Sequence, residues 1–220
     1  MENSLKNYAV LWDMDGVLVD TGDLHYLTWQ KAFEEVGYNF TREDFIDTFG
    51  RNNESIMKIL FGEDVDPVFS VRVSERKEAL FRQMLNGRVT LLPGVREWLS
   101  RFQAWGMRQA VASSAPAENI IAIADEFELR SYFNALVSGT GMPGKPHPDV
   151  FLKSAQELDV PPERCVVVED AVHGVEGARA AGMKCIAVTT TKSAEALGQA
   201  DLVLKDLTEL NEEMVHALFF

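Results

Sequence analysis

Short hydrophobic runs bounded by turn residues predict the strands of this chain. The runs are almost entirely apolar rather than alternating, which is typical of strands in a parallel sheet that helices cover on both faces. They span residues 8–12, 109–112, 135–137, 165–168 and 185–188. We therefore expect these segments to form one buried parallel sheet.

Helical patterns separate the runs from residue 89 onward. Between residues 93 and 106, four apolar residues recur with helical spacing: Val95, Trp98, Leu99 and Phe102. Residues 116–127 and 148–158 are also predicted to be helical, each beginning at a proline. Because strands and helices alternate, the pattern predicts an α/β fold with a doubly wound parallel sheet.

Residues 20–88 break this alternation, since they contain helical patterns and no clear strand. Two apolar stripes have helical spacing: Tyr26, Trp29, Phe33 and Val36, and then Phe69, Val73, Leu80 and Met84. Thr41 and Asp44 have the spacing of a capping box. We predict a catalytic core of residues 1–19 and 89–220, with an inserted helical cap of residues 20–88.

Composition limits the partners of the protein. Its 220 residues are 46% hydrophobic and 25% charged, as in ordinary globular enzymes. A formal net charge of −13 disfavours sequence-independent binding to nucleic acid or anionic lipid. No apolar run approaches the ~18 residues of a membrane span, and the N-terminus has no secretory signal pattern. We expect a cytoplasmic monomer with no nucleic-acid or membrane partner.

Both cysteines fall inside predicted strands. Cys165 and Cys185 have neither a CxxC arrangement nor metal-ligand spacing. They are therefore expected to be buried thiols in a reducing compartment.

Acidic pairs follow two of the predicted strands. Asp13 and Asp15 come after the first strand, and Glu169 and Asp170 follow residues 165–168. Open α/β sheets bind ligands beyond the carboxyl ends of their strands, so both pairs would meet at one edge. Carboxylates so close together repel one another unless a cation lies among them, and Mg²⁺ prefers oxygen ligands. The predicted ligands are Asp13, Asp170 and the backbone carbonyl of Asp15, with Glu169 acting through water.

Two other interpretations of the acidic residues are weaker. A single acidic pair at a strand end is often solvated surface charge, but two pairs at two strand ends favour a site. A calcium loop beginning at Asp13 is excluded because Val17 and Leu24 occupy positions that need oxygen ligands.

Two further strand ends carry groups that suit phosphate. Ser113 and Ser114 precede a predicted helix, whose N-terminal N–H groups bind anions. Lys145 follows residues 135–137, between prolines that stiffen the backbone. This set fits a small-molecule phosphate ester that Mg²⁺, Lys145 and the serines hold while Asp13 attacks the phosphorus.

Four motifs resemble the haloacid dehalogenase superfamily, in particular its β-phosphoglucomutase-like group with a helical cap. They are DMDGVLVDT at 13–21, VAS at 111–113, GKPHPD at 144–149 and VED at 168–170. The resemblance implies a Rossmann-like core with an inserted all-helical cap of four helices.

The resemblance also implies roles for individual residues. These are Asp13 as the nucleophile that forms an aspartyl-phosphate, Asp15 as general acid/base, Ser113 and Lys145 as phosphate ligands, and Glu169 and Asp170 as anchors of Mg²⁺. Such a carboxylate nucleophile divides phosphoryl transfer into two easier steps. A carboxylate at position 15 favours phosphate esters over carbon–halogen bonds. The predicted function is a Mg²⁺-dependent phosphatase acting on small phosphorylated metabolites, sugar phosphates foremost.

Other functions stay open at this point. A phosphosugar mutase of the β-phosphoglucomutase type is the first alternative, although Asn53 stands where such mutases have an arginine for a second phosphate. Arg51, one turn away, is the predicted substitute cation. His25 matches a hinge histidine of the mutases, and we interpret it and His173 as structural or local features.

Two remote alternatives come from other functional classes. Residues 139–144 fit G-x-G-x-x-G, the pattern of a dinucleotide-binding oxidoreductase, but prolines delay the following helix and Arg164 stands where an acid is needed. A non-catalytic binding module is disfavoured because every catalytic position is filled.

Overall fold

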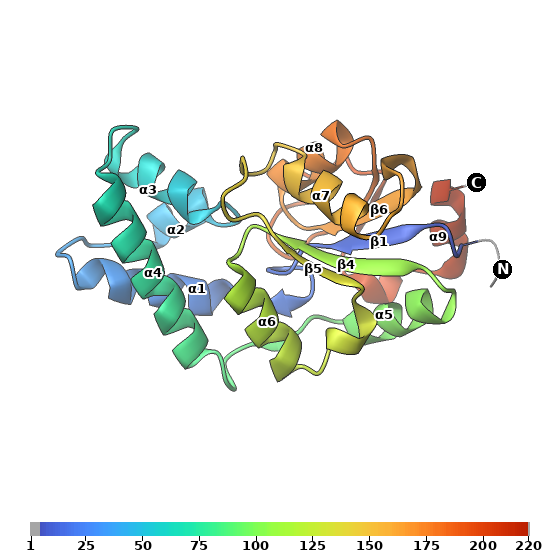
Figure 1. Cartoon of the computed structure of the whole chain (residues 1–220), viewed down its shortest axis with the longest axis horizontal. Coiled ribbons are helices and arrows are strands. Elements are labelled where there is room, and N and C mark those ends of the chain that lie inside the picture. The colour runs from blue at the N-terminus through green and yellow to red at the C-terminus, as the bar shows by residue number, and fades with distance from the viewer. Residues whose placement is uncertain (1–4, 220) are drawn as a thin grey trace.

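The computed structural model describes residues 5–219, which form a helical part and a sheet-containing part (Figure 1). Residues 1–4 and 220 of the predicted core lie outside the described residues. The helical part lies at one end of the long axis, and we call it the cap. Its helices are α1 (Gly22–Glu34), α2 (Arg42–Thr48), α3 (Asn53–Phe61) and α4 (Pro67–Met84). The remainder is called the core.

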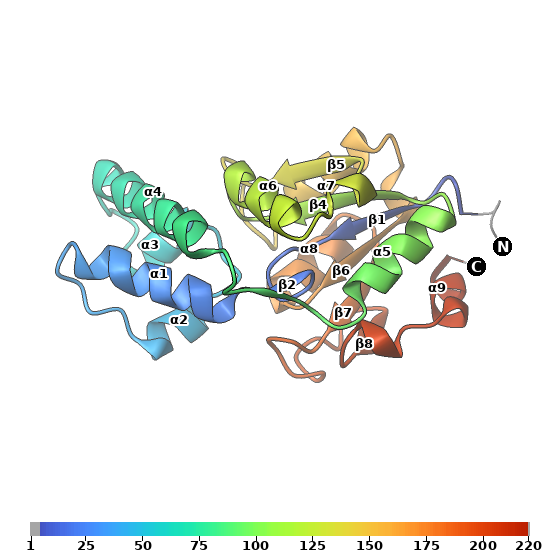
Figure 2. The same ribbon diagram turned by 90° about the horizontal axis from the view of Figure 1, so that it is seen from below.

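The core contains a six-stranded parallel sheet in the order β5-β4-β1-β6-β7-β8. The strands are β1 (Ala9–Trp12), β4 (Arg108–Ser113), β5 (Ala135–Ser138), β6 (Cys165–Glu169), β7 (Lys184–Val188) and β8 (Leu202–Leu204). The five predicted strands and the doubly wound parallel sheet are confirmed. Strand β8 was missed. The carboxyl ends of the strands point toward the cap (Figures 1 and 2), which is where ligands bind in such sheets.

Helices cover both faces of the sheet, as the continuous apolar strands require. One face carries α5 (Val95–Ala104), α6 (Ala117–Glu126) and α9 (Glu212–Phe219), and the other carries α7 (Asp149–Glu157) and α8 (Val172–Ala180). Short 3₁₀ turns occupy Arg130–Tyr132, Pro162–Arg164 and Leu207–Glu209. The helices predicted over 93–106, 116–127 and 148–158 are confirmed, each with slightly shorter bounds.

Both polar atoms of one buried side chain in the sheet are hydrogen-bonded. Gln109 in β4 accepts a hydrogen bond from Trp12 Nε1 at 3.0 Å and donates through its Nε2 to the carbonyl of Leu99 at 2.9 Å. Burying an amide without partners would be costly, so this pairing explains how a polar side chain is accommodated in a strand interior.

The cap has its own apolar core, formed where α1 packs along α4 (Figure 2). Trp29 and Phe33 stack with ring centroids 5.0 Å apart and contact Phe40. The predicted capping box is confirmed at the start of α2, where Thr41 and Asp44 exchange hydrogen bonds.

Two adjacent chain crossings connect cap and core. Strand β2 (Val19–Asp20) pairs antiparallel with β3 (Thr90–Leu91) in a two-stranded ribbon. The domain boundaries that we predict at residues 19/20 and 88/89 lie in or beside this ribbon, and the division into two domains stays a prediction.

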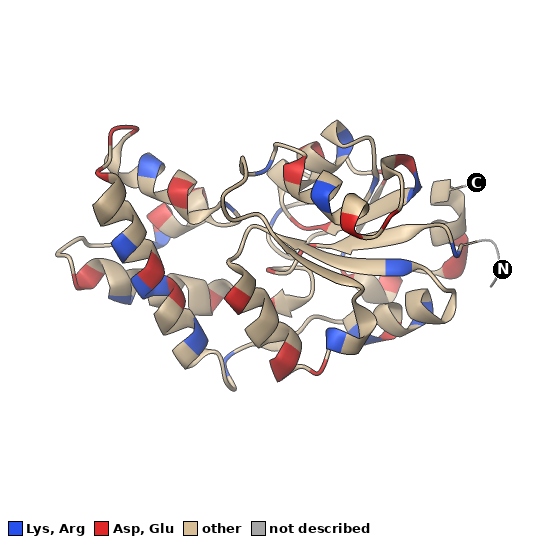
Figure 3. Cartoon of the chain, viewed as in Figure 1, with Lys and Arg blue, Asp and Glu red and all other residues tan. Residues whose placement is uncertain are grey.

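The distribution of charges, the hydropathy of the helices and the burial of the cysteines can be compared with what the composition predicts. Lys and Arg are interspersed with Asp and Glu along the helices of cap and core (Figure 3). Within residues 5–219, no helix is both long enough and apolar enough to span a bilayer. Cys165 and Cys185 are free and buried, which confirms the expected buried thiols.

Candidate active site

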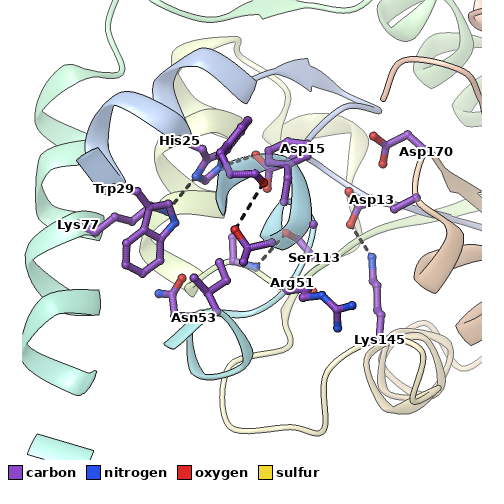
Figure 4. A pocket seen from close by; sticks show the side chains of 18 of the residues that line it. Asp13, Asp15, His25, Trp29, Arg51, Asn53, Lys77, Ser113, Lys145 and Asp170 are labelled. Carbon is purple, nitrogen blue, oxygen red and sulfur yellow. Dashed lines mark hydrogen bonds and ion pairs between the residues drawn. The ribbon is translucent and has the colours of Figure 1, made fainter. Parts of the chain in front are cut away.

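All eight residues predicted for the site line one cavity between the core and the cap (Figure 4). They are Asp13, Asp15, Arg51, Ser113, Ser114, Lys145, Glu169 and Asp170.

The loop after β1 carries the first acidic pair. Met14 is buried in the core, and the backbone N–H of Gly16 donates to the carbonyl of Val19 at 2.8 Å, which closes a tight turn. Gly16 has φ +82°, and a Cβ there would lie 2.1 Å from Oδ2 of Asp170. Glycine therefore lets this loop approach the second acidic pair closely.

Glu169 is held by backbone groups and by a lysine. Its Oε2 accepts hydrogen bonds from the N–H groups of Asp170 at 2.8 Å and Ala171 at 2.9 Å, and its Oε1 accepts from Lys145 at 2.6 Å. The carboxylate lies against Gly174 in α8, where a Cβ would be 1.8 Å from Cδ of Glu169. Glu169 therefore positions Lys145, which is compatible with its predicted outer role at a metal.

Substituting Gly174 with alanine tests this packing. The new methyl group would displace the Glu169 carboxylate and break its backbone hydrogen bonds, so we expect Gly174→Ala to lower the free energy of unfolding by about 1–3 kcal/mol. Gly22→Ala is the control, because the nearest atom to a Cβ there lies 3.9 Å away. Urea denaturation measures both; equal midpoints for Gly174→Ala and the parent protein would contradict the prediction.

Lys145 is the central cation of the site. Its side chain is 4% exposed, and its Nζ lies 2.5 Å from Oδ1 of Asp13 and 2.6 Å from Oε1 of Glu169. Burial lowers the pKa of Lys145, but the charges of Asp13 and Glu169 outweigh burial and raise the pKa above its ordinary value. Lys145 is therefore firmly charged.

The buried carboxylates outnumber the cations beside them. Burial, opposed by Lys145 and reinforced by Glu169, raises the pKa of Asp13 to about 7. Burial and the charges of Glu169 and Asp13 raise the pKa of Asp170 well above its ordinary value, although Thr191 donates a hydrogen bond to its Oδ2 at 2.6 Å. This donor set lacks positive charge, and a hard divalent cation would supply it.

The carboxylates fit a Mg²⁺ site with few protein ligands. Within the described part of the chain, no three His, Cys, Asp or Glu side chains form a ready-made metal cage. Both carboxylate oxygens of Glu169 accept hydrogen bonds, whereas Asp13, Asp15 and Asp170 each keep one carboxylate oxygen outside the hydrogen bonds found among residues 5–219. Mg²⁺ commonly uses one or two carboxylates together with waters and substrate phosphate, so the residues present fit this ion.

Asp15 faces the cap rather than the other carboxylates. Its Oδ1 accepts from Thr21 Oγ1 at 2.6 Å and from His25 Nε2 at 3.0 Å, and Lys77 Nζ lies 2.8 Å from His25 Nδ1 (Figure 4). Burial would raise the pKa of Asp15, but His25, Thr21 and Lys77 together hold it below its ordinary value. Because an ammonium only donates, His25 accepts from Lys77 and donates to Asp15.

Both histidines that the sequence analysis singled out contact residues that line the cavity, and their interpretation as structural or local features stays a prediction. The side chain of His25 is 12% exposed and links Asp15 to Lys77. Nε2 of His173 lies 2.9 Å from Nη2 of Arg51. The contact joins the loop before α3 to helix α8, so Arg51 lines the cavity while bound to the core.

The serines lie at the end of β4, as predicted. Ser113 is buried, and its Oγ accepts a hydrogen bond from the N–H of Ala115 at 3.1 Å. Ser114 is half-buried in the same loop, which leads into α6. Both face the cavity that holds Asp13 and Lys145.

Sequence reasoning missed two buried charged residues of α4, Lys77 and Glu78, that also line the cavity. Lys77 stands four residues after Val73 and three before Leu80, on the apolar face of the helix. The sequence could have indicated Lys77, because it is a charged residue at a position on the apolar face of the helix.

The dinucleotide-binding alternative is wrong. Residues 139–144 do not lead into a helix, because α7 begins only at Asp149. A dinucleotide cradle needs its last glycine to open a helix whose N-terminus faces the pyrophosphate.

The chain is similar to known proteins over most of its length, and not only in the four motifs. A family model described as haloacid dehalogenase-like hydrolase matches residues 10–188. The β-phosphoglucomutase of Bacillus subtilis is 32% identical over 219 residues, covering 94% of this chain and 93% of that protein. Hexitol phosphatase B of Escherichia coli is 32% identical over 211 residues, covering 92% and 93%. The crystal structure of CbbY from Rhodobacter sphaeroides in complex with phosphate has a TM-score of 0.85 and 28% identity, covering 93% of this chain and 96% of that one.

Proposed function

The chain belongs to the haloacid dehalogenase-like hydrolases, and on that premise we propose that it is a Mg²⁺-dependent phosphatase acting through an aspartyl-phosphate on Asp13. The observation that carries this proposal is the meeting of Asp13, Lys145 and Asp15 at one cavity. A nucleophile, a phosphate-binding cation and a proton-transfer group are the parts that monoester hydrolysis needs. Sugar phosphates are the proposed substrate class, because similar proteins include a phosphoglucomutase and a hexitol phosphatase.

The proposed reaction has two steps. First, a carboxylate oxygen of Asp13 bonds to phosphorus as the bond from phosphorus to the ester oxygen breaks, and protonated Asp15 gives its proton to the leaving oxygen. Then Asp15 takes a proton from water as the water oxygen attacks phosphorus and frees Asp13. A phosphate dianion near Asp15 would raise the pKa of that carboxyl by repulsion, which favours the proton needed in the first step.

The charged groups stabilise the transferring phosphoryl group. Lys145 neutralises negative charge on its oxygens, and Ser113 with the N–H groups before α6 offers further donors. Asp13, Asp170 and the carbonyl of Asp15 would hold Mg²⁺, which would supply additional charge neutralisation.

The cap favours hydrolysis over mutase activity. A mutase must hold a second phosphate, for which an arginine fork is well suited. Asn53, which we assign to the position of that arginine, donates to Oε1 of Glu78 at 2.8 Å, while Arg51 is bound to His173. Water is therefore the proposed acceptor of the phosphoryl group.

Product analysis tests the proposal. The enzyme is incubated with β-glucose 1-phosphate, catalytic glucose 1,6-bisphosphate and Mg²⁺, while phosphate and glucose 6-phosphate are followed together; a panel of other sugar phosphates is run beside it. We expect phosphate release from sugar monophosphates that stops when EDTA removes the metal, because the buried carboxylates then lose their cation. Formation of glucose 6-phosphate faster than phosphate would favour the mutase, and full activity in EDTA would contradict the metal role.

A further inference from the structure

Glu78 is a buried carboxylate that the proposed chemistry does not use. It lies on α4 and is 5% exposed. Its Oε1 accepts from Lys77 Nζ at 2.9 Å and from Asn53 Nδ2 at 2.8 Å, and its Oε2 accepts from Asn119 Nδ2 at 2.5 Å. Asn53 begins α3 and Asn119 belongs to α6, so this one carboxylate joins two cap helices to the core.

Glu78 is ionised at neutral pH. Burial opposes ionisation, but the charge of Lys77 and the hydrogen bonds from Asn53 and Lys77 outweigh burial and hold the pKa of Glu78 below its ordinary value. A carboxylate charge, paired with the Lys77 ammonium at 2.9 Å, is therefore fixed at the cap side of the catalytic cavity.

This charge stands between two spaces. The catalytic cavity has a volume of about 60 Å³, enough for a few waters and well below the usual size of a small-molecule pocket. A groove of about 840 Å³ lies between α3, α4 and the start of α6. The two spaces share only Asn53 and Glu78 among their lining residues. Because these two side chains are hydrogen-bonded to each other, their contact forms the wall between cavity and groove.

The groove is acidic as well. Its charged lining residues besides Glu78 are Glu54, Glu63, Glu75, Glu118, Lys58 and Arg82. Lys58 pairs with Glu54 at 2.7 Å, whereas Arg82 Nη1 donates to Oδ1 of Asn119 at 2.8 Å, a neutral amide that leaves the charge of Arg82 uncompensated. With Glu78, the groove residues comprise five carboxylates against these two cations, so a second phosphate in this space would meet a net negative charge. Hydroxyl groups could instead donate to Glu78 and accept from Asn53.

We propose that Glu78 determines the specificity of the site, admitting phosphate esters of neutral polyhydroxylated alcohols and rejecting esters whose alcohol part carries a second anionic group. The inference deepens the proposed phosphatase function and rests on it. In this arrangement the alcohol part of the substrate reaches the contact between Asn53 and Glu78, on the groove side of the cavity, while its phosphate meets Asp13 and Lys145.

The test removes the charge of Glu78 while keeping its shape. The kcat/KM values for fructose 1-phosphate and fructose 1,6-bisphosphate are compared in the parent protein and in Glu78→Gln. We expect the parent to prefer the monophosphate at least about tenfold, and Glu78→Gln to reduce this preference about tenfold, because juxtaposed like charges strongly disfavour a ligand. Glu35→Gln is the matched control, since Glu35 is an exposed cap glutamate paired with Arg76 outside both spaces.

Binding measurements separate this inference from the proposed function. Calorimetric dissociation constants of the two esters are measured in Asp13→Asn, with and without Glu78→Gln. If Asp13→Asn bound the monophosphate more tightly than the bisphosphate but the parent protein released no phosphate, the phosphatase function would be refuted. The role of Glu78 in specificity would still stand. Equal binding of the two esters, or equal losses for both in Glu78→Gln, would overturn the specificity role.

A second variant guards against misfolding of Glu78→Gln. Glu78→Asp keeps the charge and shortens the side chain by one methylene. It is expected to keep most of the preference for the monophosphate, because the charge rather than the length excludes the second phosphate. Loss of the preference in Glu78→Asp would also overturn the inference.

Discussion

Replacing Asp13 with asparagine is expected to lower kcat for a phosphate monoester by a factor on the order of 10³ or more, as removal of a covalent nucleophile does in other enzymes. An amide oxygen is a poor nucleophile, and Glu169, the other carboxylate bonded to Lys145, has both of its oxygens engaged in hydrogen bonds. Phosphate release under saturating substrate measures kcat, and intact mass after rapid quenching detects a phosphoryl adduct on the parent protein alone.

The fold is expected to survive this change. The amide keeps a hydrogen-bond acceptor toward Lys145, and it removes a carboxyl group whose burial opposes ionisation. Asp23→Asn is a control, because Asp23 is 91% exposed and pairs with Arg42 on the surface. If Asp13→Asn kept more than about a tenth of the parent kcat, where loss of a nucleophile costs far more, Asp13 would not be the nucleophile.

Most of the core was predictable because its signals are local. Uninterrupted apolar runs bounded by turns predicted β1, β4, β5, β6 and β7, since strands buried on both faces need apolar side chains at every position. Strand β8 has three residues at the edge of the sheet, and Leu202 and Val203 are only half-buried. So short a run has no detectable period.

The core side of the site was also predictable, for a topological reason. Parallel strands deliver their carboxyl ends to one edge, so Asp13, Ser113, Lys145 and Glu169 had to lie near one another once the sheet was inferred. No family knowledge is needed for that step. The resemblance adds roles for the residues, and those roles await the experiments described above.

The cap side could not be predicted in the same way. Contacts of Lys77 with His25, and of Glu78 with Asn119, depend on how α4 packs against α1 and α6. Helical periodicity says which face of α4 is buried, but it does not say which core residue that face meets. The pairing of Arg51 with His173 could not be predicted from the sequence for the same reason.

Replacing Lys145 with methionine is expected to impair both catalysis and stability. The change removes the positive charge that would face the transferring phosphoryl oxygens. We therefore expect kcat/KM to fall about 10²–10³-fold, the cost of losing one electrostatic donor in a preorganised site. Ser113→Ala should cost less, because it removes a single neutral hydrogen bond. Effects under twofold for both variants would mean that neither side chain contacts the phosphate.

The stability effect of Lys145→Met follows from burial. The change leaves the carboxylates of Asp13 and Glu169 buried without their shared cation, and breaking such a pair costs about 3–5 kcal/mol of unfolding free energy. Lys153→Met removes a lysine of α7 whose pair with Glu157 is 42% and 46% exposed, so its expected cost is only about 0.5 kcal/mol. Urea denaturation in EDTA compares the two variants without interference from bound metal. Equal unfolding midpoints for the two variants would contradict the proposal that Lys145 stabilises the acidic edge of the sheet. The buried ion pairs of Lys145 would then contribute no more to stability than the solvated pair of Lys153.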